Sequence, residues 1–200
     1  MRAGAAIALV MLLAGCGNST PIGNLDGSAR AGVDPSLIDT SAADHCDFLD
    51  PSVCLYPFPN DYFTVADPTT DTGRRLNLQL LAMPRNAASL PIDPSPYNRE
   101  DGFSPGQMIV TRVPGLDSPE AMAATGAVPV NDLARYADPD QPIVVINAAT
   151  GVRQPIWSEV DMAENVLKNG HPPPAPENRS LIIRPAINFD EGARYIVALR

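Results

Sequence analysis

Residues 143–157 have the sequence IVVINAATGVRQPIW, which is typical of an antiparallel β protein. The β-branched run Ile143–Asn147 is followed by small turn residues at 148–151, and residues 152–157 return toward Trp157. This order predicts two antiparallel strands joined as a hairpin. Short apolar runs separated by turns continue on both sides of it.

Further strands are predicted at residues 61–65, 75–80, 107–113, 180–184 and 194–199. Ser118, Pro119 and Glu120 have the order of an N-cap and a first turn, which predicts a short helix to about residue 124. A second short helix is predicted at residues 161–168. The 22 prolines are about twice the ordinary share. The chain is therefore predicted to be mainly β, an antiparallel β-sandwich with proline-rich loops and one or two short helices.

The size and charge of the chain exclude several classes of function. Its 200 residues are enough for one domain with a sizeable core. The formal charge of −9 argues against binding to nucleic acid and against electrostatic attachment to anionic lipid. The sequence has no phosphate-binding loop and no dinucleotide motif, so no cofactor is predicted.

The first residues, MRAGAAIALVMLLAGCG, have the pattern of an export signal. Arg2 precedes an apolar run that is too short to span a membrane, and small residues close the run. The sequence Leu-Ala-Gly-Cys ending at Cys16 resembles the lipobox of bacterial lipoproteins. The resemblance implies cleavage after residue 15 and a diacylglycerol group on the thiol of Cys16. Because Gly17 is not the inner-membrane retention residue Asp, we expect an outer-membrane location; an ordinary cleaved signal with a chance cysteine is the alternative.

Two cysteines remain if Cys16 carries lipid. Cys46 and Cys54 are expected to form a disulfide, since an exported chain enters an oxidising compartment. Two free buried thiols are the alternative, and a metal site with His45 is the weakest reading because no second cysteine pair is present. Residues 16–43, rich in small and polar side chains, are predicted to be a flexible tether, and residues 44–200 the folded domain.

One motif suggests catalysis and is rejected. Residues 102–106, GFSPG, match the G-x-S-x-G pattern around a hydrolase nucleophile. That pattern needs a strand before Ser104 and a helix after it, and Pro105 has no N–H to donate to an oxyanion. His45 and His171, the histidines of the chain, have no catalytic sequence context. No catalytic residue is therefore predicted.

The other candidates have structural explanations. Glu159 with Asp161, and Asp138 with Asp140, are interpreted as solvated charges rather than paired catalytic acids. Asp67 and Asp71 are candidate Ca²⁺ ligands, but their loop lacks the ligand spacing of an EF-hand, and no metal site is predicted. Trp157 is interpreted as a core residue rather than a platform for sugars.

Four long phrases carry a family resemblance. They are CDFLDPSVCLYPFPNDYFTVADPTTDTGRRLNL from Cys46, DGFSPGQMIVTRVPGLD from Asp101, PIVVINAATGVRQPIWSEVD from Pro142 and SLIIRPAINFDEGARYIVALR from Ser180. They are similar to the N-terminal region of large exported bacterial lipoproteins of the virulence-factor-lipase and α/β-hydrolase-associated type. The pattern RPAxxxxEGxRYIVAL at residues 184–199 also resembles the last strands of bacterial Ig-like domains. The resemblance implies an Ig-like sandwich and no catalytic residue, because the hydrolase motifs of such proteins follow this region.

These observations support three hypotheses about function. The first is a lipid-anchored, non-catalytic module that belongs to a C-terminal hydrolase domain. The second is a stand-alone cell-surface binding or adhesion domain, and the third is an esterase that uses Ser104. The chain stops at Arg200 directly after an apolar run, which favours the first hypothesis and the N-terminal portion of a longer protein.

Overall fold

The computed structural model describes residues 7–12, 56–80, 83, 86, 88, 90–162 and 175–200, with only the backbone described for 7–12. The strands are β1 (Ile7–Leu12), β2 (Thr64–Ala66), β3 (Arg74–Leu76), β4 (Ile109–Thr111), β5 (Ile143–Asn147), β6 (Ile156–Val160), β7 (Leu181–Pro185) and β8 (Arg194–Leu199). The helix is α1 (Pro119–Thr125), and the 3₁₀ helices are η2 (Asp61–Phe63), η4 (Tyr97–Arg99), η5 (Leu133–Ala137) and η6 (Pro176–Asn178). All of these strands pair antiparallel, so the mainly β fold is confirmed.

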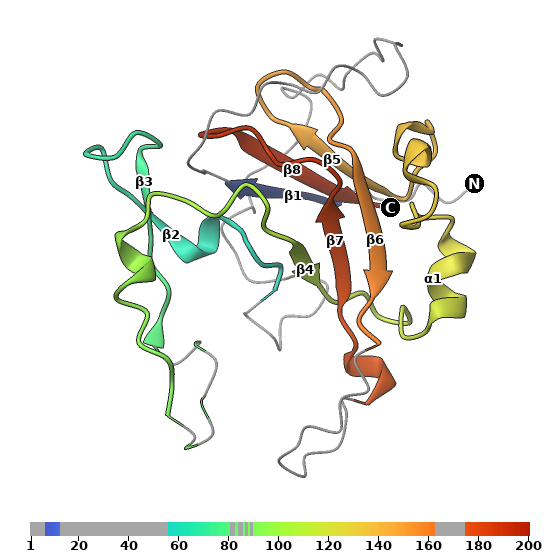
Figure 1. Ribbon diagram of the computed structural model, residues 1–200, viewed down its shortest axis with the longest axis horizontal. Coiled ribbons are helices and arrows are strands. Elements are labelled where there is room, and N and C mark those ends of the chain that lie inside the picture. The colour runs from blue at the N-terminus through green and yellow to red at the C-terminus, as the bar shows by residue number, and fades with distance from the viewer. Residues whose placement is uncertain are drawn as a thin grey trace.

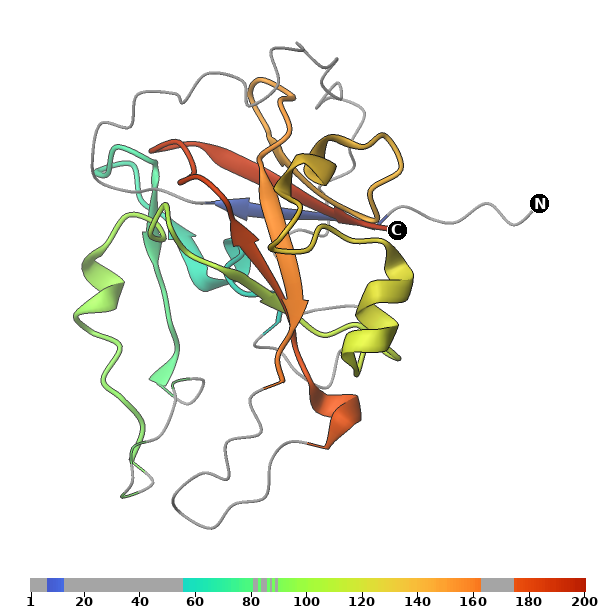
Figure 2. The ribbon, with the colours of Figure 1, turned by 45° about the vertical axis from the view of Figure 1, so that its right-hand side comes forward.

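Two three-stranded sheets enclose the core. Their strand orders are β1-β8-β5 and β4-β7-β6, and β2 pairs with β3 in a separate arm. Figure 1 shows this arm projecting on the left and α1 flanking β6 on the right. The strands of the two sheets cross each other in both ribbon views (Figures 1 and 2). Buried residues of both sheets form one cluster, including Val145 and Val197 from the first sheet and Ile156 and Ile183 from the second.

The predicted hairpin is confirmed next to its turn, but its second strand does not continue to Trp157. β5 spans Ile143–Asn147 as expected, and Gly151 closes the turn with a φ of 71°. The returning chain pairs with β5 only briefly: Ile146 bridges Arg153, and the N–H of Gln154 donates to the carbonyl of Val145 at 2.8 Å. Pro155 has no N–H to continue this ladder. The chain then crosses to the other sheet, where β6 pairs with β7.

The other predicted elements differ mainly in their ends. The strands expected at 75–80 and 107–113 are shorter, at Arg74–Leu76 and Ile109–Thr111. The strand expected at 61–65 is divided between η2 and β2. The helix after Ser118 is confirmed, and the Ser118 hydroxyl accepts from the N–H of Ala121 at 3.1 Å. Most of the helix expected at 161–168 lies outside the described residues.

The loop between β7 and β8 is fixed to the core. Phe189 is fully buried, and its ring lies 4.6 Å from that of Tyr195, edge to face. Its N–H donates to the carbonyl of Pro105 at 3.0 Å, and the N–H of Asp190 donates to the Tyr195 hydroxyl at 2.9 Å. The bond from Phe189 to Pro105 therefore holds the turn at residues 102–106 against the β7–β8 loop.

Candidate functional site

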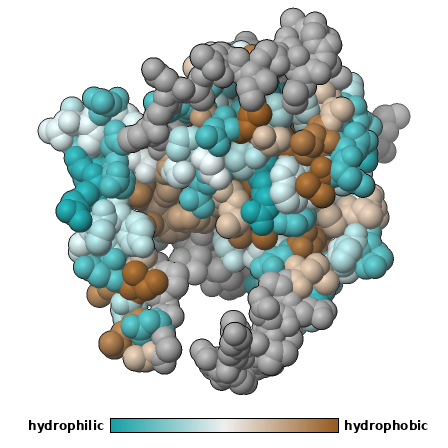
Figure 3. Space-filling model, viewed as in Figure 1, coloured by the Kyte–Doolittle hydropathy of each residue, from teal (hydrophilic) through white to brown (hydrophobic). Residues whose placement is uncertain are grey.

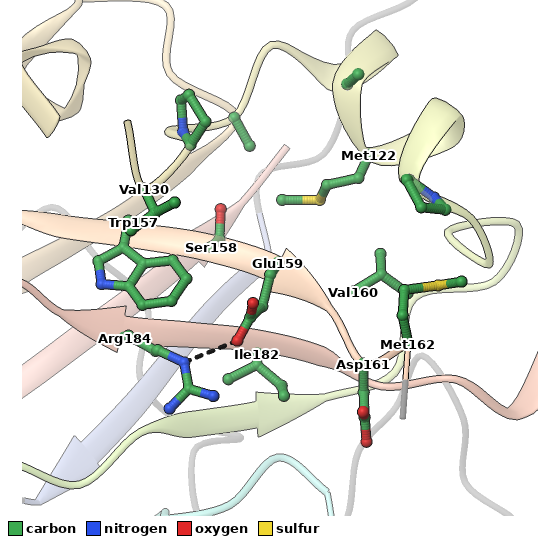
Figure 4. A pocket seen from close by; sticks show the side chains of 14 residues that line it. Met122, Val130, Trp157, Ser158, Glu159, Val160, Asp161, Met162, Ile182 and Arg184 are labelled. Atoms are coloured by element: carbon green, nitrogen blue, oxygen red, sulfur yellow. Dashed lines mark hydrogen bonds and ion pairs between the residues drawn. The ribbon is translucent and has the colours of Figure 1, made fainter. Parts of the chain in front are cut away.

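A groove runs along β6 between α1 and the outer face of the second sheet (Figure 4). We call it the β6 groove, and its volume is about 590 Å³. It is lined by Pro119, Met122, Ala123, Ala127, Pro129, Val130, Trp157, Ser158, Glu159, Val160, Asp161, Met162, Ile182 and Arg184. Its lining combines an indole, an ion pair and aliphatic side chains.

The alternation of β6 separates its buried side chains from the partly exposed ones. Ile156, Ser158 and Val160 are buried, and the residues between them, Trp157 and Glu159, point to the other face. The register places Trp157 opposite Arg184, and Glu159 opposite Ile182, on β7. The strand pair β6–β7 therefore supplies Trp157, Glu159 and Arg184 to the groove, and Asp161 lines it directly after β6.

Trp157 is not a core residue, contrary to the prediction. The Arg184 guanidinium lies over its ring at 5.2 Å, and the Nε of Arg184 donates to Glu159 Oε1 at 2.8 Å. Both charged side chains are more than a third exposed, at 36% and 41%, so the ion pair contributes less than about 1 kcal/mol to stability. Trp157, Arg184 and Glu159 together form an ordered, partly exposed surface that consists of an indole and two paired charges.

A second cavity lies between the β2–β3 arm and β4. We call it the aromatic cavity, and its volume is about 610 Å³. It is lined by Tyr56, Phe58, Phe63, Leu76, Leu78, Met83, Tyr97, Glu100, Gly102, Phe103, Ser104, Gln107 and Val110. In Figure 3 the surface is hollowed beside the arm, and apolar residues show in the hollow.

The floor of the aromatic cavity is a cluster of three rings. Phe58 lies 5.2 Å from Phe63 and 5.5 Å from Phe103, in both cases edge to face. Phe63 and Phe103 are 4% and 5% exposed, whereas Glu100 and Ser104 are exposed. The cavity thus has an apolar floor with polar groups at its rim, which is the usual composition of a site for a small apolar ligand.

Ser104 stands in a turn rather than in a nucleophile elbow. Its carbonyl accepts from the N–H of Gln107 at 2.9 Å, and β4 begins at Ile109. A strand therefore follows Ser104 where a hydrolase elbow has a helix, as the sequence predicted. The residue lines the aromatic cavity, a position that its motif alone did not indicate.

The carboxylate of Asp67, a candidate Ca²⁺ ligand, is engaged by the protein itself. Its Oδ1 accepts from the N–H and the hydroxyl of Thr69 at 2.9 and 2.6 Å, and its Oδ2 accepts from Arg75 Nε at 2.6 Å. These donors, Thr69 first, lower the pKa of Asp67 from 3.8 to about 2. This carboxylate closes the turn before β3.

The stability of the fold is expected to depend on ionised Asp67. Because its pKa is lower in the folded chain than the ordinary 3.8, the charged form stabilises the fold above about pH 4. That contribution is lost as the pH falls from about 4 to about 2. Chemical unfolding of the wild type and Asp67→Asn should therefore give curves that differ at pH 6 and converge near pH 2. Arg75→Gln should weaken the effect; parallel curves over the whole range would contradict it.

The remaining predicted residues are placed as follows. Cys16, Cys46, Cys54, His45 and His171 lie outside the described residues, so the lipid attachment and the disulfide stay predictions. Glu159 pairs with Arg184, and Asp138 lies 3.7 Å from Arg135, both as partly exposed charges.

The described part of the chain has neither a cluster of metal ligands nor a membrane-spanning helix. Its His, Cys, Asp and Glu residues include no group of three or more that is arranged to hold a metal ion. Its helices include none that is long and apolar enough to cross a membrane. No family model, curated protein or solved structure matches the chain.

Proposed function

We propose that the chain is an exported bacterial lipoprotein whose domain is a non-catalytic module of a lipase- or esterase-like hydrolase. The sequence up to Cys16 supports export and a lipid anchor in the cell envelope, at the outer membrane. Two antiparallel sheets around one core support a mainly β module, and its Ig-like character is what the resemblance implies. The partners of this module are the bilayer, through acylated Cys16, and a C-terminal hydrolase domain.

The aromatic cavity is the observation that carries this proposal. Its floor of three phenylalanine rings suits an uncharged aliphatic or aromatic group, and its volume is within the usual range for a ligand site. The carboxylate of Glu100 at the rim disfavours an anionic head. The ligand class is therefore the acyl part of a neutral ester, which the module presents beside the membrane.

The surroundings of Ser104 favour binding rather than catalysis. Pro105 supplies no N–H for an oxyanion. Among the described lining residues, Glu100 is the only carboxylate, and none is a histidine. The reaction is therefore assigned to the hydrolase domain and not to this module.

A tryptophan introduced at the rim tests whether the aromatic cavity binds an uncharged apolar ligand. Ser104→Trp should fill the mouth and weaken binding of the uncharged fluorophore N-phenyl-1-naphthylamine about tenfold, measured by fluorescence titration. A monoacylglycerol should displace the fluorophore from the wild type. Met108→Trp is the matched control, since Met108 is exposed but does not line the cavity. Equal affinity in the wild type and Ser104→Trp, or no saturable binding, would refute the proposal.

The β6 groove supports the alternative of a stand-alone binding or adhesion domain. Trp157 and the paired charges of Arg184 and Glu159 form a surface that can contact a polar partner without any hydrolase domain. The two functions are distinguished by Trp157→Ala, which should reduce attachment to a partner surface while leaving fluorophore binding unchanged. If only the fluorophore site responds to substitution, the hydrolase module is favoured.

A further inference from the structure

Three of the four outer strands of the two sheets, β5, β4 and β6, have backbone hydrogen bonds to neighbouring segments. The covering hydrogen bonds join Asn147 with Val152 (2.9 Å) and Gln154 with Val145 (2.8 Å) beside β5, Phe58 with Val110 (2.7 and 2.8 Å) beside β4, and Ser158 with Val128 (2.9 Å) beside β6. The fourth outer strand is β1, which pairs with the central strand β8 on the side away from β5. Without β1, that side of β8 would be an edge of the sheet, and we call it the β8 edge. An uncovered edge is a template for another strand, so the occupant of the β8 edge matters for assembly.

The backbone of β8 shows which groups this edge presents. The carbonyl of Arg194 accepts from Ala148 at 2.7 Å, and the N–H of Arg200 donates to Pro142 at 3.1 Å, both on the β5 side. Because successive residues of a strand direct their backbone groups to opposite sides, alternate residues face the other edge. Tyr195, Val197 and Leu199 therefore direct their N–H and carbonyl groups toward β1.

The strand that covers this edge belongs to the segment predicted to be cleaved. β1 pairs antiparallel with β8 from Ile7 opposite Leu199 to Leu12 opposite Arg194. Cleavage before Cys16 removes all of β1. The edge left open would then present the N–H and carbonyl groups of Tyr195 and Val197, and such a row of backbone groups is a template for another strand.

We propose that the β8 edge is a strand-acceptor site, which an uncharged apolar strand of a partner polypeptide occupies after signal cleavage. This rests on the proposed cleavage before Cys16. The signal strand holds the site in the precursor, so the partner can dock only after export. Backbone hydrogen bonds provide the affinity, as in other cases of strand addition to a sheet edge.

The strand seated on β8 defines the chemistry of the partner. Its sequence, IALVML, has no charge, no proline and no glycine. A second copy of the chain fits less well. If the β8 strands of two copies paired antiparallel, the charged Arg194 of each copy would lie against the apolar part of the other copy's β8. Arg194 already forms an ion pair with buried Asp61. The partner is therefore a different chain that supplies an aliphatic strand.

The test removes β1 from the folded full chain. A specific protease site is placed within residues 18–43, the folded protein is cut, the N-terminal fragment is separated from it, and hydrogen exchange is followed at the amides of Tyr195 and Val197. Both amides should lose protection on cutting. They should regain it when a labelled peptide of residues 7–12, flanked by lysines for solubility, is added. If the cut chain unfolds, refolding by this peptide supports the site, and failure to refold overturns it.

Two proline peptides make the test specific. Leu9→Pro removes the N–H that faces Val197, whereas Ala8→Pro removes one that faces away. In fluorescence anisotropy the first should bind about tenfold more weakly than the second. Equal binding of the two peptides, protection that persists after the N-terminal fragment has been separated, or dimerisation of the cut chain without peptide uptake would overturn the proposal. Lipidation is tested separately through the mass of the exported chain, so the two proposals fail independently.

Discussion

Replacing Phe189 with alanine is expected to lower the free energy of unfolding by about 3–5 kcal/mol. The side chain is fully buried between the sheets and stacks edge to face on Tyr195. Alanine would leave a cavity that the surroundings cannot close, because the N–H of Phe189 is bonded to Pro105 and fixes the backbone there. Urea unfolding of the full chain, followed by circular dichroism, measures the loss.

Two further variants test whether the loss of stability comes from the space left by the removed Phe189 ring. Phe189→Leu keeps most of the volume and should cost clearly less than Phe189→Ala. Val152→Ala is an exposed control, since Val152 is 57% exposed, and should change the free energy of unfolding by less than about 0.5 kcal/mol. A loss below about 1 kcal/mol for Phe189→Ala would mean that this loop is not part of the core.

Replacing Cys16 with serine is expected to move nearly all of the exported chain from the membrane fraction to the soluble fraction. The body of the protein has no electrostatic hold on anionic lipid, since the formal charge of the chain is −9. Anchoring then depends on the acyl chains, which contribute about 0.8 kcal/mol per buried methylene. Fractionation of expressing bacteria and the intact mass of the protein measure the effect.

The other cysteines provide the control for this substitution. Cys46→Ser removes the predicted disulfide but leaves the lipidation site, so this variant should stay in the membrane fraction with the acyl mass unchanged. If Cys16→Ser still sediments with membranes, or if the wild type carries no acyl mass, the lipoprotein proposal is wrong.

Local sequence signals predicted the elements whose residues decide their own conformation. Ile143–Asn147 is β-branched and forms β5, and Ser118 caps α1 as its side chain predicts. The pairing of strands was less predictable. A proline at 155 ends the pairing with β5, and burial of Ile156 and Val160 then takes β6 into the other sheet. A sequence pattern shows the turn but not which sheet receives the strand.

Local sequence patterns also could not predict the aromatic cavity and the β6 groove, because both depend on which strands pair. The rings of Phe58 and Phe63 stand in a stretch that is dense in aromatic residues, which is a usable signal, but Phe103 joins them only through the fold. The place of Trp157 at the end of the predicted hairpin predicts a core position for it. Its position one residue from Ile156 on β6 places it on the opposite face, where Arg184 of β7 meets it.

The bond between Phe189 and Pro105 also bears on how the aromatic cavity would select the ligand proposed for it. It ties the turn that carries Ser104 to a loop whose side chain is fully buried. This part of the mouth is therefore preorganised, and a ligand does not have to meet the entropic cost of ordering it. A rigid mouth recognises by shape rather than by induced fit, so the cavity should discriminate among acyl groups by their width.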